Sequence, residues 1–177
     1  IVATAETPFD FLLADRSLFP GVPIVYTAFG PAEAAAERTT PGVAGVFIVG
    51  VYGKTLEAML AIHPGTEQVF VVTSLPNNGG QARENIVRHE LARFESELKL
   101  TYLTDLPTSE LVGKLSHAPA KSLVLYVRHA EDSSEGGLNP VEAASLLARV
   151  SSVPMYSIAR TYFGQGIVGG YLADHEV

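Results

Sequence analysis

The hydrophobic pattern alternates along the chain between short unbroken apolar runs and stretches with apolar residues three or four positions apart. The runs that predict strands are residues 1–5, 22–29, 43–51, 68–73, 98–103, 122–127, 153–158 and 165–172. Most of the stretches between them have helical spacing, as in 54–63, where Leu56, Met59, Leu60 and His63 share one side. Regular alternation of strands and helices is typical of an α/β fold with a mostly parallel, doubly wound sheet.

The run at residues 122–127, S-L-V-L-Y-V, is apolar throughout after its first residue. Such a run predicts an interior strand that is covered by helices on both faces. Arg128 and His129 follow it directly, with Glu131 and Asp132 just beyond. Charged residues past the carboxyl end of a central strand occupy the place where open α/β sheets bind their ligands.

The chain is predicted to divide into three parts. Residues 1–29 form a β-α-β unit, and residues 30–42 are small, polar and poor in large apolar side chains, as in a crossover or hinge. Residues 43–177 then form a larger α/β unit. Within it, Asn139-Pro140-Val141-Glu142 predicts a helix start, with Asn as the cap, Pro in first position and Glu in third.

Composition narrows the function classes. The 177 residues are 47% hydrophobic and 18% charged, which indicates a compact domain or a domain with part of another. The longest apolar run, 43–52, is too short to cross a bilayer. Because the chain begins with Ile1 rather than Met, we expect it to be a trimmed part of a larger protein.

The charge and residue types exclude several partners. The net charge of −7 and the lack of a basic run argue against nucleic acid as a partner. The absence of cysteine excludes disulfides, thiolate metal sites and thiol nucleophiles. The five histidines never fall in a metal-binding spacing, so we predict no metal and no cofactor.

Two motifs resemble phosphate-binding or phosphate-transferring sequences, but neither has the full pattern of its family. Residues 50–55, G-V-Y-G-K-T, end like a phosphate-binding P-loop, but Ile48 stands where that pattern requires its first glycine. Residues 128–131, R-H-A-E, resemble the signature of histidine phosphatases, in which the histidine takes up a phosphoryl group. In that family the signature lies on the first strand and a second histidine follows, whereas this motif comes late in the chain.

Several segments together resemble a known family. Their common feature is that they are strand ends and turns, in the same order as in that family. They are residues 18–26, 41–46, 55–72, 100–107, 122–126, 151–156 and 161–171. They resemble the second lobe of type I periplasmic binding proteins of the ABC-transporter substrate-binding kind. More closely, they resemble the extracytoplasmic sensor domains of bacterial histidine kinases that share this fold.

The resemblance implies the end of a first lobe followed by a complete second lobe. It implies a non-catalytic domain that senses a small solute in a cleft between lobes, within a two-component signal transduction system. The domain would lie in the periplasm, as part of an inner-membrane protein with a kinase domain in the same chain, and would form a homodimer. Two alternatives remain open: a freestanding solute-binding protein of an ABC transporter, and a histidine phosphatase that uses His129.

The predicted ligand site lies at the carboxyl ends of the second-lobe strands, where three successive loops meet. Tyr26 is expected to add an apolar wall from the first lobe. The residues predicted to line the site are Ser74, Asn77, Asn78, Arg128, His129, Arg160, Tyr162 and Tyr26. Because arginine offers a bidentate fork and a permanent charge, the expected solute is a small anionic or carboxylate-bearing metabolite.

Overall fold

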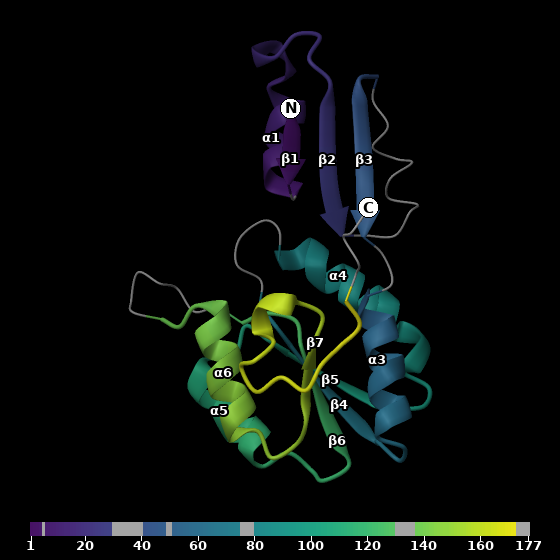
Figure 1. Cartoon of the computed structure of the whole chain (residues 1–177), viewed down its shortest axis with the longest axis vertical. Coiled ribbons are helices and arrows are strands. Elements are labelled where there is room, and N and C mark those ends of the chain that lie inside the picture. The colour runs from purple at the N-terminus through teal and green to yellow at the C-terminus, as the bar shows by residue number, and fades with distance from the viewer. Residues whose placement is uncertain (5, 30–40, 49–50, 75–79, 130–136, 173–177) are drawn as a thin grey trace.

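The computed structural model describes residues 1–4, 6–29, 41–48, 51–74, 80–129 and 137–172. In these ranges the strands form two separate parallel sheets, of three and of four strands. Figure 1 shows the two sheets as successive units along the long axis of the molecule. The predicted α/β class with parallel sheets is therefore confirmed.

The first sheet has the order β1-β2-β3, formed by β1 (Val2–Thr4), β2 (Ile24–Phe29) and β3 (Val43–Ile48). Helix α1 (Glu6–Ala14) follows β1 and precedes the short helix η1 (Arg16–Leu18). A small core joins α1 to one face of this sheet, and in it the Phe9 ring stacks on Tyr26 with ring centroids 3.9 Å apart.

The pairing of β3 corrects the predicted division of the chain. Residues 43–51 were expected to open the second lobe, but β3 pairs in parallel with β2, with Ile24 opposite Val43 and Phe29 opposite Ile48. Its partners lie about twenty residues earlier in sequence, and a hydrophobic run does not reveal which strand it will pair with. The change from the first sheet to the second therefore falls between β3 and the next helix.

The second sheet has the order β5-β4-β6-β7 and is also parallel. Its strands are β4 (Gln68–Thr73), β5 (Lys99–Thr104), β6 (Ser122–Tyr126) and β7 (Met155–Ser157). The central run of the sequence is thus an interior strand, as predicted, and all five residues of β6 are buried. Helices α3 (Val51–Ile62) and α4 (Gly80–Leu91) cover one face, and α5 (Thr108–Ser116) and α6 (Pro140–Val150) cover the other.

Alternate residues of β4 and β6 divide between these two faces. Val69, Val71, Leu123 and Leu125 pack under α3 and α4, while their sequence neighbours pack under α5 and α6. Burial of each such side chain contributes about 1.5–3 kcal/mol, so β6 is held from both sides. The predicted cap of α6 is confirmed, because the Asn139 side chain accepts hydrogen bonds from the N–H groups of residues 141 and 142.

The last predicted strand, residues 165–172, is not a strand. Gly164 and Gly166 adopt φ values of 83° and 90°, which turn the chain out of the extended conformation. Only an isolated bridge between Phe163 and Ile167 is assigned in this part of the described chain. The segment still runs beside β7, where the Val168 N–H donates to the Met155 carbonyl at 2.9 Å.

The carboxyl edges of the two sheets face each other. The arrowheads of β2 and β3 point toward the second unit (Figure 1), and α3 starts on the near edge of that unit, three residues after β3 ends. Because α3 runs away from the first sheet and β4 returns toward it, the strands of the second sheet end on this same edge. The Tyr171 N–H donates to Thr55 Oγ1 at 3.1 Å, so the C-terminal segment also returns to the start of α3.

Candidate functional site

Two buried hydroxyl groups lie at the end of β4. Thr73 is the last residue of the strand and Ser74 follows it, and Ser74 is only 2% exposed. Neither hydroxyl oxygen has a hydrogen-bond partner among the residues that the structure describes. Leaving a buried polar group unpaired costs about 1–3 kcal/mol, so these hydroxyls favour a partner that brings its own polar atoms.

Arg128 lies just past β6, on the neighbouring strand. Its backbone N–H continues the pairing with β4 by donating to the Val72 carbonyl at 3.3 Å, which fixes the residue beside the end of that strand. The side chain is partly buried, and its Nε has no partner in the described part of the chain. A buried guanidinium nitrogen without an acceptor is a site where an anion or carbonyl oxygen would bind favourably.

Tyr162 comes from the third loop, in the short helix η5 (Arg160–Tyr162) that follows β7. Its ring meets Tyr126 edge to face, with centroids 5.0 Å apart. Burial raises the pKa of the Tyr162 hydroxyl, and the Arg128 and Arg83 guanidinium groups partly oppose that rise. Both cations therefore lie within electrostatic range of this hydroxyl.

Arg83 and Tyr52 belong to this edge but were not predicted. Arg83 is in the first turn of α4, is partly buried and forms no ion pair with any described residue. Tyr52 is buried at the start of α3, and burial raises its pKa to about 12, with Arg83 acting to lower it. The sequence signal was the position of Arg83, shortly after the loop that follows β4 and so at the same edge as Arg128.

Two carboxylates of α4 near this edge bind groups of the chain, although Glu84 Oε2 has no partner among the described residues. Glu90 accepts hydrogen bonds from the backbone N–H groups of Tyr52 at 2.8 Å and Gly53 at 3.0 Å. Glu84 binds Arg88, with Arg88 Nε 2.8 Å from Glu84 Oε1. The first amides of α3 are thus bound by a carboxylate, which agrees with the interpretation that the P-loop-like stretch is a turn into a helix.

The predicted site residues separate into those that converge and those that do not. Ser74, Arg128 and Tyr162 meet at the carboxyl edge, and Arg160 is exposed on the same edge. Asn77 and Asn78 lie outside the described residues.

Two predicted residues point elsewhere. The His129 side chain is 2% exposed, and its Nε2 lies 3.0 Å from Thr108 Oγ1 at the start of α5. Tyr26 is buried against Phe9 in the core of the first sheet, so it does not form the exposed wall that was expected. Successive side chains of β2 point to opposite faces of the sheet, and Tyr26 is on the face that α1 covers. The apolar run 22–29 did not reveal which face each residue would take.

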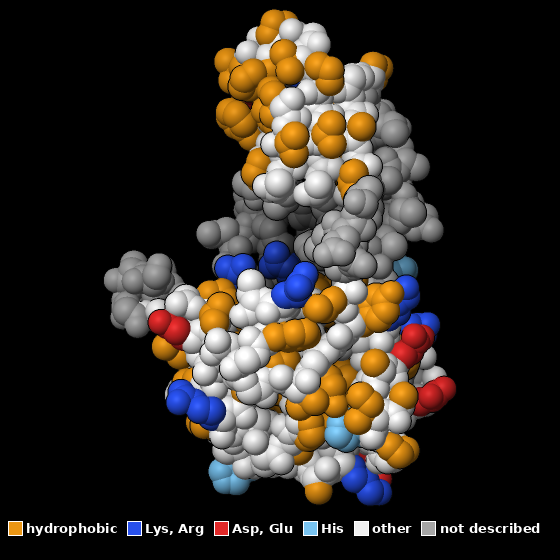
Figure 2. Space-filling view, viewed as in Figure 1, with side chains coloured by type: hydrophobic (Ala, Val, Ile, Leu, Met, Phe, Trp, Pro, Cys, Tyr) orange, Lys and Arg blue, Asp and Glu red, His pale blue; other side chains and the backbone are white. Residues whose placement is uncertain are grey.

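The surface charge agrees with this grouping. On the face drawn in Figure 2, Lys and Arg side chains gather along the edge of the second unit that faces the first sheet, and the described acidic side chains in view lie at its flanks. The described basic residues on this edge include Arg83, Arg128 and Arg160, and Lys54 lies in the first turn of α3. A chain with a net charge of −7 therefore concentrates positive charge where its two sheets face each other.

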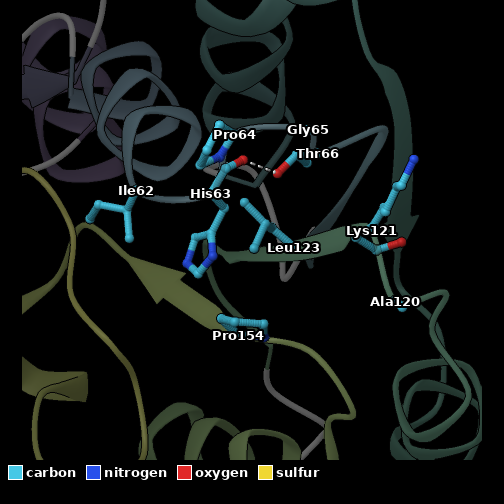
Figure 3. A pocket seen from close by; sticks show the side chains of 10 residues that line it. Ile62, His63, Pro64, Gly65, Thr66, Ala120, Lys121, Leu123 and Pro154 are labelled. Atoms are coloured by element: carbon cyan, nitrogen blue, oxygen red, sulfur yellow. Dashed lines mark hydrogen bonds between the residues drawn. The ribbon is translucent and has the colours of Figure 1, made fainter.

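A cavity of about 300 Å³ lies at the opposite, amino edge of the second sheet. It is lined by the end of α3, the start of β6 and Pro154, as Figure 3 shows. His63 Nε2 lies 2.8 Å from the Tyr156 hydroxyl, and Lys121 forms an ion pair with Glu67. Its charged and imidazole groups are thus engaged, so the carboxyl edge is the better candidate for a ligand.

Two searches within the described residues give negative results. They contain no group of three or more His, Cys, Asp or Glu side chains placed to hold a metal ion. No helix in the described ranges is long and apolar enough to span a bilayer.

The comparisons with known proteins support the fold. No protein-family model matches the chain, and no curated protein matches it. A conserved domain protein from Vibrio cholerae matches with a TM-score of 0.59 and 20% identity, over 95% of this chain and 56% of that one. An ABC domain from Streptococcus pneumonia, solved in complex with L-Trp, matches with a TM-score of 0.55 and 16% identity, over 98% of this chain and 59% of that one.

These similarities show an α/β fold of the periplasmic-binding-protein kind. The chain spans less than two thirds of the length of either structure. The resemblance seen in the sequence is thus confirmed at the level of the fold.

Proposed function

We propose that this chain is the extracytoplasmic ligand-sensing domain of a membrane-bound sensor histidine kinase, and that it binds a small solute between its two α/β units. The observation that carries the proposal is the carboxyl edge of the second sheet. There, Ser74, Arg128 and Tyr162 come from three loops, and Ser74 Oγ and Arg128 Nε have no hydrogen-bond partner among the described residues. Ligands of parallel α/β folds bind at such edges, especially between two units.

The fold and its neighbours support the binding of a small molecule. The pneumococcal neighbour was solved with L-Trp, a small solute that carries a carboxylate. A solute that contacts both units has higher affinity for a closed arrangement and shifts the population toward it. In the proposed sensor this shift is transmitted through the membrane to a kinase domain in the same protein.

A solute screen by thermal unfolding tests the binding step. A ligand at a hundred times its Kd adds about 2.7 kcal/mol to the free energy of unfolding, which raises Tm by roughly 5–10 °C for a chain of this size. We expect Arg128→Ala to remove most of this increase, and Arg160→Ala to remove less, because Arg160 is exposed. If both variants respond to the solute as the parent does, the site assignment is wrong.

A freestanding solute-binding protein of an ABC transporter is the second candidate. The same cleft would serve it, so the flanking sequence of the gene decides between the two roles. A transmembrane helix and a kinase domain encoded in the same gene support the sensor, and a gene that ends with a solute-binding domain supports the transporter.

Phosphatase activity is disfavoured by the position of His129. The imidazole is enclosed beside Thr108, whereas a phosphoryl acceptor must reach its substrate. We expect no hydrolysis of p-nitrophenyl phosphate above the buffer rate, in the parent chain or in His129→Ala. Turnover by the parent that disappears in the variant would favour the phosphatase instead.

A further inference from the structure

Arg83 and Arg128 are two cations that share a neighbour. Arg83 reaches the edge of the second sheet from α4, and Arg128 from the end of β6. Both act on the Tyr162 hydroxyl, and Arg83 also acts on the Tyr52 hydroxyl. Both guanidinium groups therefore lie within electrostatic range of the same hydroxyl at this edge.

Arg83 and Arg128 differ from several other basic residues in forming no ion pair within the described ranges. Ion pairs among the described residues join Arg88 to Glu84, Arg93 to Glu57, Lys114 to Glu110 and Lys121 to Glu67. Neither Arg83 nor Arg128 has a carboxylate partner in the described ranges, although both are partly buried. Two partly buried like charges repel each other, and an anion placed between them relieves that cost.

The groups around the two arginines are hydrogen-bond donors. The hydroxyls of Thr73 and Ser74 are buried and unpaired among the described residues, and Arg128 Nε is likewise without an acceptor. The Tyr52 and Tyr162 hydroxyls can also donate, since a tyrosine hydroxyl is protonated at neutral pH and burial raises the pKa of each further. Unpaired donors favour a ligand rich in acceptor oxygens.

We propose that the solute carries an oxyanion, a carboxylate or phosphate group, that binds between Arg83 and Arg128 and accepts hydrogen bonds from Ser74. This inference rests on the proposed function and names the ligand class of that site. It also replaces the predicted pair of Arg128 and Arg160, since Arg83 is the partly buried second cation. Because neither arginine has a carboxylate partner among the described residues, a doubly charged oxyanion is favoured over a singly charged one.

Calorimetric titration of the chain with inorganic phosphate and with succinate tests the inference and separates the two oxyanion sources. We expect one of them to bind, with affinity that falls as salt is added. Arg83→Ala and Arg128→Ala should each weaken binding by roughly 10–100-fold, as loss of a charge-assisted hydrogen bond predicts. Arg83→Lys keeps the charge without the fork and should give an intermediate loss.

Arg149→Ala is the matched control, because Arg149 is exposed in the last turn of α6. It should bind the oxyanion as the parent does, and circular dichroism of each variant confirms that it is folded. Equal binding by the parent, Arg83→Ala and Arg128→Ala overturns the inference.

Titration with L-tryptophan separates this inference from the proposed function. If neither anion binds but L-tryptophan does, and both arginine variants bind it unchanged, the oxyanion class is wrong while solute binding stands. If no solute of any class raises Tm or releases heat, both the inference and the proposed function are overturned.

Discussion

At the scale of single residues, Tyr126 connects β6 to the segments that carry Arg128 and α6. Its hydroxyl donates to the Pro140 carbonyl at 2.7 Å and accepts from the His129 N–H at 3.1 Å. Tyr126→Phe removes these bonds, together with the 3.2 Å contact of the hydroxyl with the His129 carbonyl. We expect the free energy of unfolding to fall by about 1–3 kcal/mol, measured by urea denaturation.

Tyr102→Phe is the matched control for this prediction. The Tyr102 hydroxyl is buried but has no hydrogen-bond partner among the described residues, while its ring contacts the Arg88 guanidinium. Removing that oxygen keeps the ring, breaks no described hydrogen bond and removes an unpaired polar group, so stability should stay the same or rise. Equal losses in the two variants would contradict the role given to the Tyr126 bonds.

The candidate site was predictable where a residue directly follows a strand. Ser74 and Arg128 were found in this way, because parallel strands bring such residues to one edge. Arg83 was missed because it lies inside a helix, where an arginine usually faces solvent. The direction of His129 depends on Thr108, twenty-one residues earlier, and the sequence pattern contains no information about that contact.

At the scale of elements, substitutions at two glycines test the effect of backbone conformation without an effect of side-chain packing. Gly65 follows α3 with φ of 89°, and Gly113 lies within α5, and a Cβ at either position would meet nothing within 4 Å. Gly65→Ala should destabilise the fold by about 1–2 kcal/mol, because alanine is strained at positive φ. Gly113→Ala should stabilise it by about 0.5–1 kcal/mol. Thermal unfolding that shifts in the same direction for both variants would contradict this assignment.

Element types were predictable from local periodicity, and element partners were not. Residues 68–73 form β4 with the predicted bounds, since a buried strand between turns has a local signature. The membership of β3 in the first sheet depends on pairing with β2, which is decided by tertiary packing. The segment 165–172 has a strand-like composition, but the positive φ values at Gly164 and Gly166 prevent a regular ladder.

At the scale of the whole molecule, tyrosine burial makes stability depend on alkaline pH. Burial raises the pKa of Tyr52 to about 12 from the unfolded value of 10.0. The contribution of the protonated Tyr52 hydroxyl to the free energy of unfolding is therefore complete below pH 10 and is lost as the pH rises toward 12. Tyr126 and Tyr162 shift in the same direction. We expect the free energy of unfolding to fall by roughly 3 kcal/mol through Tyr52 alone across this window.

Urea denaturation at several pH values, with phenolate absorbance followed in parallel, measures this effect. Tyr52→Phe should flatten the alkaline part of the pH profile, because phenylalanine has no hydroxyl to ionise. An unchanged slope in Tyr52→Phe would show that another group controls the loss of stability.

The first sheet has an apolar face that α1 does not cover, and this face predicts self-association. The strand register places Val2, Val25 and Val46 on the side opposite Tyr26, and Val2 and Val46 are 69% and 57% exposed. An exposed apolar patch of this kind favours contact with a second copy, in line with the homodimer expected for a sensor kinase. We expect weak, concentration-dependent dimerisation in sedimentation velocity, and Val46→Thr should weaken it while keeping a β-branched side chain in the strand.

Ile62→Thr is the control, because Ile62 is similarly exposed but lies at the end of α3. A strict monomer at high protein concentration, or an equal effect of the two substitutions, would show that this face is not where two copies meet.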